Sequence, residues 1–139
     1  MNAWPQMIEI IGLRGKTDPF DLADRLEKGL PVSALERLAK VVAPGDAAFK
    51  YRIVPRATLA RRKNAGRLSP AESEKVARVA RVWAFAKEVW KTDDSVRRFM
   101  AAENMYLRDR TPLDVVLGSE VGAKEVEHVI GAIKYSIVL

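Results

Sequence analysis

The sequence predicts an all-α fold for this chain of 139 residues. Apolar residues recur at the three- and four-residue spacing of helices in most segments. Several of these segments begin with a capping residue followed by proline and end at glycine, which are the usual start and stop signals of helices. A hydrophobic content of 48% with 30% charged residues is typical of a globular protein and not of a disordered one.

The N-terminal third contains two predicted helices and one undecided segment. Residues 4–13 fit a helix and a strand equally well, because their isoleucines suit both. The first clear helix has Asp18 as N-cap and Pro19 at its first position, and Gly29 ends it. Its apolar face is predicted to consist of Phe20, Leu22, Ala23 and Leu26. A second helix is predicted over about 31–42.

A short and weaker segment separates these helices from a basic one. Residues 46–52 offer Asp46 as a candidate cap but few apolar positions. The basic helix then starts at Pro55, directs Leu59 inward, and stops at residues 64–66. We therefore predict three consecutive helical segments, of which the third carries most of the charge.

The longest predicted helix runs from Ser69 to about Trp90. Ser69 and Glu72 form a capping box, in which each side chain can accept a hydrogen bond from the other residue's amide. One apolar stripe contains Val76, Val79, Ala80, Trp83, Ala86 and Trp90, a second contains Val82, Phe85 and Val89, and a narrow polar strip contains Glu74, Arg78, Arg81 and Glu88. A helix with so little polar surface is a core helix, a dimer helix, or both. Dimer contact is assigned to the second stripe.

Shorter helices are predicted for the rest of the chain. Thr92 or Asp93 caps one that reaches Met100, a loop and a helical turn that begins at Thr111 follow, and Ser119 caps the last helix. The buried stripe of that last helix is predicted to be Val126, Val129, Ile130 and Ile133. The chain ends in the apolar sequence YSIVL.

Positive charge is concentrated in residues 50–67. This stretch holds seven of the chain's 24 cations and no carboxylate, so it carries the net charge of +6 almost alone. A local positive field is expected of a surface that binds a polyanion. The pattern favours a helix-turn-helix with a recognition helix over 55–63. A solvated basic helix, or one that binds an acidic protein, remains the alternative.

Residues with catalytic or metal-binding chemistry are sparse. There is no cysteine, and His128 is the single histidine, so no convincing metal-ligand set can be assembled. Neither a glycine-rich phosphate loop nor a nucleophile with a base at motif spacing is present. We predict no enzyme activity, catalytic residue, metal, cofactor or small-molecule substrate. The sequence also shows no secretory signal or membrane span, so a cytoplasmic location is expected.

Two sequence blocks carry a resemblance to a known family. They are TLARRKNAGRLSPAES, from Thr58 to Ser73, and RTPLD, from Arg110 to Asp114. With the segments around them, these blocks resemble antitoxins of the Xre/MbcA/ParS type, which neutralise toxins of the RES-domain class. The similarity covers most of residues 18–139.

The resemblance implies a two-part, all-helical homodimer from a type II toxin–antitoxin system. Residues 1–67 would comprise an N-terminal segment and an Xre-like helix-turn-helix domain, and residues 68–139 a toxin-binding and dimerisation domain. The protein would bind a RES-domain toxin that consumes NAD, occlude its active site, and help to repress its own operon by binding operator DNA. The alternative is a stand-alone dimeric helix-turn-helix transcription regulator without a toxin partner.

The resemblance also assigns contact residues. DNA contact is implied for Arg56, Thr58, Arg61, Arg62 and Lys63. Toxin contact is implied for Lys134, Tyr135, Ser136, Ile137, Val138 and Leu139. The loop over residues 104–110 is a second candidate for toxin contact.

The chain departs from the family pattern at two turns. Arg52 stands where a glycine is usual in the turn before the recognition helix, and Lys50 stands at a usually apolar position. Because positive φ is unfavourable for arginine, we expect this turn to be rebuilt or the motif distorted. Arg108 and Asp109 are among the residues that replace the Pro and Gly common in the second loop, whose shape is therefore expected to differ.

Overall fold

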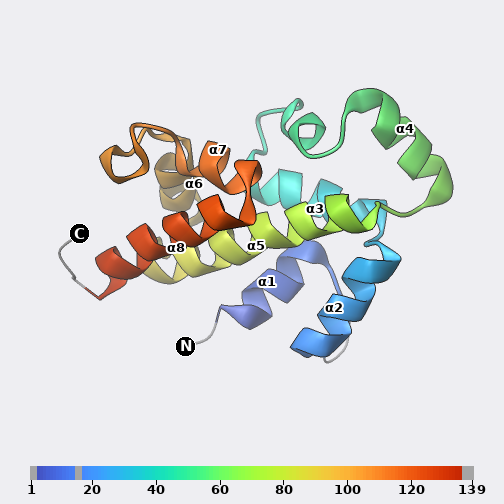
Figure 1. The fold of residues 1–139 in the computed structure, drawn as a ribbon, viewed down its shortest axis with the longest axis horizontal. Coiled ribbons are helices and arrows are strands. Elements are labelled where there is room, and N and C mark those ends of the chain that lie inside the picture. Colours follow the sequence, from blue (N-terminus) through green and yellow to red (C-terminus); the bar gives the residue numbers. More distant parts are fainter. Residues whose placement is uncertain (1–2, 15–16, 136–139) are drawn as a thin grey trace.

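The computed structural model describes residues 3–14 and 17–135 of the chain. Within these residues the only regular elements are helices, which confirms the predicted all-α class (Figure 1). The α-helices are α1 (Trp4–Ile11), α2 (Pro19–Lys28), α3 (Val32–Val42), α4 (Arg56–Ala65), α5 (Pro70–Trp90), α6 (Asp93–Ala101), α7 (Pro112–Gly118) and α8 (Glu120–Lys134), and the 3₁₀ helices are η1 (Phe49–Arg52) and η2 (Met105–Leu107).

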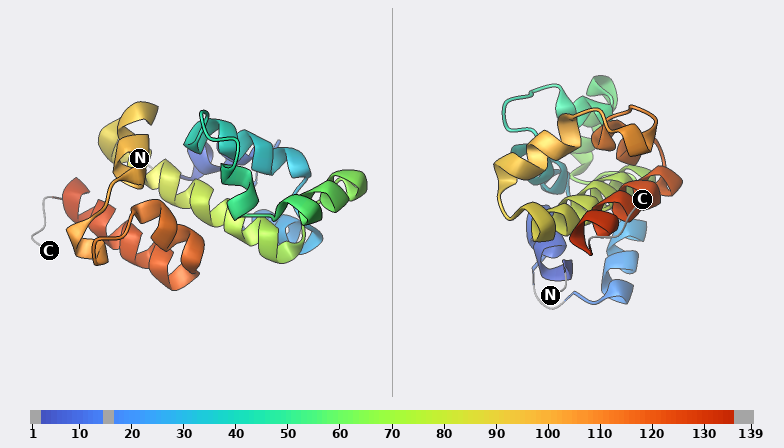
Figure 2. Two further views of the ribbon diagram at one scale, coloured as in Figure 1. Left: turned by 90° about the horizontal axis from the view of Figure 1, so that it is seen from above. Right: turned by 90° about the vertical axis from the view of Figure 1, so that its left-hand side faces the viewer.

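Helix α5 is the central element of the fold. It packs against α1, α2 and α3 from the N-terminal part and against α6, α7 and α8 from the C-terminal part (Figures 1 and 2). Val76, Val79 and Val82 are fully buried, and Trp83 is nearly so. The predicted core helix is therefore confirmed, and one continuous apolar core crosses the predicted domain boundary at residues 67 and 68.

Side-chain caps fix the starts of several helices. The Ser69 hydroxyl accepts a hydrogen bond from the Glu72 amide at 3.1 Å, and the Glu72 carboxylate accepts one from the Ser69 amide at 2.8 Å. This is the predicted capping box. Thr92, Thr111 and Ser119 cap α6, α7 and α8 in the same way through their hydroxyls. Local sequence signals therefore locate these helix starts correctly.

The undecided N-terminal segment forms helix α1. Its Met7, Ile8 and Ile11 are buried between α3 and α5. The indole Nε1 of Trp4 donates a hydrogen bond to the Thr17 carbonyl at 2.8 Å, so the end of the connection to α2 is held near the start of α1. Helix α1 thus covers a face of α5.

The turn before α4 is rebuilt. This is the first of the two alternatives expected from the sequence, a rebuilt turn or a distorted motif. Residues 46–54 contain no positive φ angle, so Arg52 does not occupy a glycine conformation. In place of a second full helix the chain forms the 3₁₀ turn η1, anchored by the fully buried Phe49. Helix α4 follows and projects from the body of the molecule (Figure 1), with Leu59 as its one buried residue.

Gly29 is required where α2 meets α3. Its φ is +94°, and a Cβ atom built there would lie 2.1 Å from the Leu68 carbonyl oxygen. This close approach lets the Leu68 amide donate to the Leu30 carbonyl at 2.8 Å, while the Leu30 amide donates to the buried Ser73 hydroxyl at 2.8 Å. The start of α3 is thereby joined to the connection between α4 and α5.

Three predicted core residues, Phe20, Ala23 and Ile133, lie at the surface. Phe20 is 83% exposed, because α2 packs on α5 through the narrow strip of Leu22 and Leu26 and Phe20 lies outside that strip. Ile133 is 46% exposed, because the buried stripe of α8 ends with Ala132 and none of the described elements covers the last turn on the side of Ile133. All three predictions were wrong.

Candidate DNA and partner surfaces

The seven cations of residues 50–67 have different partners in the structure. Three of them form ion pairs: Arg52 with Asp114 of α7, Arg62 with Glu72 of α5, and Lys63 with Glu36 of α3. Arg67 donates to the Gly29 carbonyl at 3.0 Å. Several charges that looked available for DNA in the sequence are thus engaged within the chain.

Arg56 and Arg61 lie exposed on α4. Arg61 makes no ion pair or hydrogen bond among the described residues, and Arg56 stacks on the Tyr51 ring with its guanidinium carbon 4.1 Å from the ring centre. Thr58 is half-buried in the first turn. The N-cap of α4 is Pro55, which supplies no side-chain hydrogen bond, so the first amides of this helix have no side-chain cap.

Arg62 is a structural arginine in this arrangement. Its Nε and Nη2 donate to the two oxygens of Glu72 at 2.9 and 3.3 Å, and the same carboxylate closes the capping box of α5. Burial opposes ionisation of Glu72 most strongly, but hydrogen bonds from Arg62 and Ser69 and the Arg62 charge together lower its pKa below the ordinary value. The pair fastens the C-terminal half of α4 to α5.

The predicted DNA contacts therefore separate into two groups. Arg56 and Arg61 are exposed without a carboxylate partner among the described residues, whereas Arg62 and Lys63 are paired. Sequence reasoning predicted Glu72 in the capping box but missed its ion pair with Arg62, although a carboxylate ten residues after Arg62, across a short turn, is the available signal. It also missed the contact of Tyr51 with Arg56.

The last turn of α8 is pinned to α5. Lys134 Nζ donates to Glu88 at 2.6 Å and lies 5.5 Å from the centre of the Phe85 ring. The hydrogen bond to Glu88 is the main cause that raises the pKa of Lys134 above its ordinary value. Tyr135, directly after it, is 65% exposed. The other predicted toxin contacts, Ser136, Ile137, Val138 and Leu139, lie outside the described residues.

The loop over residues 104–110 is closely hydrogen-bonded within itself. The Asn104 amide donates to the Arg110 carbonyl at 3.0 Å, and the Asp109 amide donates to the Asn104 carbonyl at 2.9 Å. Arg108 and Asp109 adopt left-handed conformations, with φ of 55° and 62°, which are uncommon for residues other than glycine. The loop holds Met105 and Tyr106 exposed, at the same end of the molecule as the end of α8 (Figure 2).

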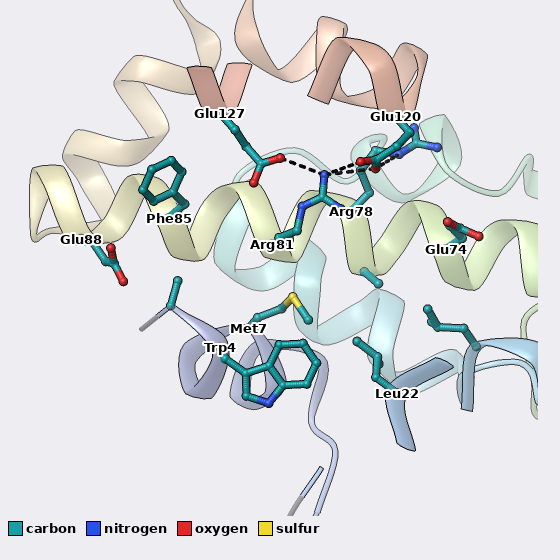
Figure 3. Close-up of a pocket in the computed structure, with 13 residues that line it drawn as sticks. Trp4, Met7, Leu22, Glu74, Arg78, Arg81, Phe85, Glu88, Glu120 and Glu127 are labelled. Atoms are coloured by element: carbon teal, nitrogen blue, oxygen red, sulfur yellow. Dashed lines mark hydrogen bonds and ion pairs between the residues drawn. The ribbon is translucent and has the colours of Figure 1, made fainter. Parts of the chain in front are cut away.

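A groove of about 530 Å³ runs along α5 between α8 and the α1–α2 pair (Figure 3). The predicted polar strip of α5 lies along it, facing apolar side chains of α1 and α2. Arg81 Nη2 donates to Glu120 at 2.9 Å and to Glu127 at 3.0 Å. Burial lowers the pKa of Arg81 most, but these two carboxylates outweigh it and raise the pKa overall. The groove's main cations are thus neutralised internally.

The second stripe of α5 is largely covered by the chain itself. Val82 is fully buried, so its side chain has no surface for a second copy in this conformation. Phe85 and Val89 are half-buried and keep some surface. Helix α8 supplies part of this cover, because Phe85 lies against Gly131 and Lys134 of that helix.

The order of α3, η1 and the protruding α4, followed by a second group of helices on α5, is that of a helix-turn-helix protein with an added C-terminal domain. Comparison with protein families agrees: residues 21–81 match the antitoxin Xre-like helix-turn-helix domain, and residues 85–135 match the antitoxin Xre/MbcA/ParS C-terminal toxin-binding domain. The chain belongs to the Xre-type antitoxins. A search of curated proteins gave no match. No helix in the described part is long and apolar enough to cross a membrane.

Proposed function

We propose that this antitoxin acts as a homodimer in the cytoplasm, as part of a type II system. It neutralises a RES-domain, NAD-degrading toxin by binding it and occluding its active site, and it contributes to repression of its own operon. The observation that carries the proposal is the toxin-binding domain match combined with an exposed apolar surface at one end of that domain.

The toxin-binding surface is proposed to comprise the end of α8, the residues after it, and η2. Met105, Ile133 and Tyr135 are 75%, 46% and 65% exposed, and Tyr106 is 57% exposed. Large exposed apolar and aromatic side chains that gather at one end of a molecule are typical of protein interfaces. Lys134 is proposed to act indirectly at this surface, because its pairing with Glu88 holds the C-terminal end of α8 in place.

The DNA-binding surface is proposed to be the exposed side of α4. Arg56 and Arg61 supply cations, and the first amides of the helix have no side-chain cap and can donate to phosphate. Arg62 and Lys63 hold the helix in place and contribute to the field around it. For the homodimer, Phe85 and Val89 are the remaining candidates of the predicted stripe.

The toxin half is tested by co-expression with a RES-domain toxin. Full-length chain is expected to restore growth and cellular NAD, and removal of residues 135–139 or Met105→Ser is expected to reduce both. Val121→Ser is the matched control, because Val121 is equally exposed but lies in the first turn of α8. If the truncated chain protects as well as the full chain, occlusion by the tail is wrong; protection by no variant favours a stand-alone regulator.

The DNA half is tested by binding to a duplex from the region upstream of the gene at several salt concentrations. Arg61→Ala is expected to weaken binding and to reduce the salt slope by about 1, as removal of one phosphate contact does. Lys124→Ala, which removes an exposed cation from α8, is the control. Equal affinity and slope in wild type and Arg61→Ala would show that α4 is not the recognition helix.

A further inference from the structure

Tyr51 and Arg56 form a preassembled pair beside the start of α4. The Arg56 guanidinium carbon lies 4.1 Å from the centre of the Tyr51 ring, and its Nη1 donates to the Tyr51 hydroxyl at 3.2 Å. Lys50 Nζ lies 5.4 Å from the centre of the same ring. Arg56 makes no ion pair with a carboxylate among the described residues, so its charge is not neutralised there.

The turn that carries Tyr51 is itself well anchored. Phe49 on one side and Val54 on the other are fully buried. The Ile53 and Val54 amides both donate to the Lys50 carbonyl, at 3.2 and 3.0 Å. Tyr51 is therefore attached to a backbone segment with little conformational freedom. Arg56, which stacks on the Tyr51 ring, is held in a defined position as a result.

The defined position of Arg56 matters because immobilising an arginine side chain costs conformational entropy. A free arginine loses much rotamer entropy when it binds a phosphate or a base edge. A guanidinium that is already stacked on an aromatic ring keeps its charge and most of its donors while part of that entropy is lost beforehand. In contrast, Arg61 on the same helix has no such support among the described residues.

We propose that Tyr51 is a positioning residue for DNA binding, which holds Arg56 in the orientation in which it contacts the DNA backbone at the start of α4. The inference rests on the proposed DNA-binding function and adds a residue to it. Tyr51 acts through Arg56 and supplies no charge, so its removal changes affinity without changing the number of phosphates neutralised.

The test is a double-mutant cycle with the full chain and two duplexes, one from the upstream region of the gene and one of random sequence. Tyr51→Leu, Tyr51→Phe, Arg56→Ala and the Tyr51→Leu/Arg56→Ala double variant are compared over a salt series, and thermal unfolding of each confirms that it is folded. Tyr51→Leu is expected to weaken binding about threefold to tenfold, the range for loss of a cation–π contact and preorganisation. Tyr51→Phe, which keeps the ring, is expected to lose less.

The salt slope and the cycle separate positioning from a merely structural role. Tyr51→Leu is expected to keep the wild-type slope, whereas Arg56→Ala lowers it by about 1. In the Arg56→Ala background, Tyr51→Leu is expected to cause no further loss. An equal loss in both backgrounds, or no loss in either, overturns the inference while DNA binding stands. If wild type binds neither duplex at low salt, the DNA-binding proposal and this inference fall together.

Discussion

Helices α4 and α8 are attached to the central helix in different ways. Helix α8 buries five residues, Ala123, Val126, Val129, Ile130 and Ala132. Helix α4 buries Leu59 alone, and its side chains are otherwise attached by the ion pairs of Arg62 with Glu72 and of Lys63 with Glu36 and by the contact of Arg56 with Tyr51. Helix α4 and the C-terminal end of α8 lie at opposite ends of the molecule's long axis (Figure 1).

The difference teaches how firmly each surface is held. Burying an apolar side chain stabilises a fold by about 1.5–3 kcal/mol, whereas exposed ion pairs typically contribute about 0–1 kcal/mol and weaken with salt. The α8 surface is therefore part of the cooperative core. The α4 surface is a locally fastened element that can adjust when it meets DNA.

The largest effect is expected from a cavity under α8. Ile130→Ala is expected to reduce the free energy of unfolding by about 2–5 kcal/mol, because Ile130 is fully buried in the core. Leu59→Ala is expected to reduce the free energy of unfolding by less, because the core helices stay packed when α4 is released. Denaturant unfolding followed by tryptophan fluorescence measures both variants. Equal shifts would show that α4 belongs to the same cooperative unit as α8.

A smaller effect is expected from the carboxylate that fastens α4. Glu72→Gln keeps an oxygen for the capping box but removes the charge opposite Arg62, and it is expected to cost up to about 1 kcal/mol at neutral pH. Since the Glu72 pKa is lowered in the folded state, this contribution is present above the ordinary carboxyl pKa of about 4.3 and is lost as pH falls through the folded-state value.

Unfolding of wild type and Glu72→Gln at pH 7 and at pH 3 checks the sign. The difference between the two proteins is expected at pH 7 and is expected to shrink at pH 3. Ser119→Ala, which removes the hydroxyl cap of α8, is the control whose effect should not depend on pH in this way. A difference that grows toward acid pH would contradict the assigned role of Glu72.

Salt is expected to loosen α4 selectively. Raising ionic strength from about 0.05 to 0.5 M screens exposed ion pairs but leaves apolar packing intact. Amide hydrogen exchange should therefore accelerate a few-fold in residues 59–65 and stay unchanged in residues 123–132. Protection that is insensitive to salt in both helices would mean that Leu59 alone holds α4.

The smallest effect is expected at the link between η1 and α7. Asp114 pairs with Arg52 next to the proposed DNA surface. Asp114→Asn removes a negative charge there and frees a cation, so DNA affinity is expected to rise about twofold at low salt and the gain to vanish at high salt. Asp94→Asn, which neutralises an exposed carboxylate on α6, is the control. Lower affinity in Asp114→Asn would show that the pair orients the turn.

Features that depend on nearby residues in the sequence were predicted better than features that depend on contacts between distant parts of the chain. The starts of α5, α7 and α8 follow from hydroxyl caps within three residues, and the buried faces of α5 and α8 largely follow from helical spacing. Burial of Phe20 was predicted wrongly because amphipathic spacing does not say how wide a strip the neighbouring helix covers.

The candidate surfaces depended on partners far away in the chain. The resemblance assigned Lys134 to toxin contact, and in the structure Lys134 pairs with Glu88, 46 residues earlier in the chain. The resemblance assigned Arg62 to DNA contact, and in the structure Arg62 pairs with Glu72 of the next helix. Such pairings depend on how helices meet, and composition and periodicity carry no information on that.

The junction between the two matched domains lies inside α5, where the consecutive residues Val82, Trp83 and Ala84 are buried. In the native protein the junction is therefore part of a buried helix, and it is not an exposed extended segment that a protease can cleave. For the same reason, a gene fusion that cuts at this point would separate two halves that each lose the centre of their core. The helix-turn-helix and toxin-binding domains therefore share one core, and neither is expected to fold without the other.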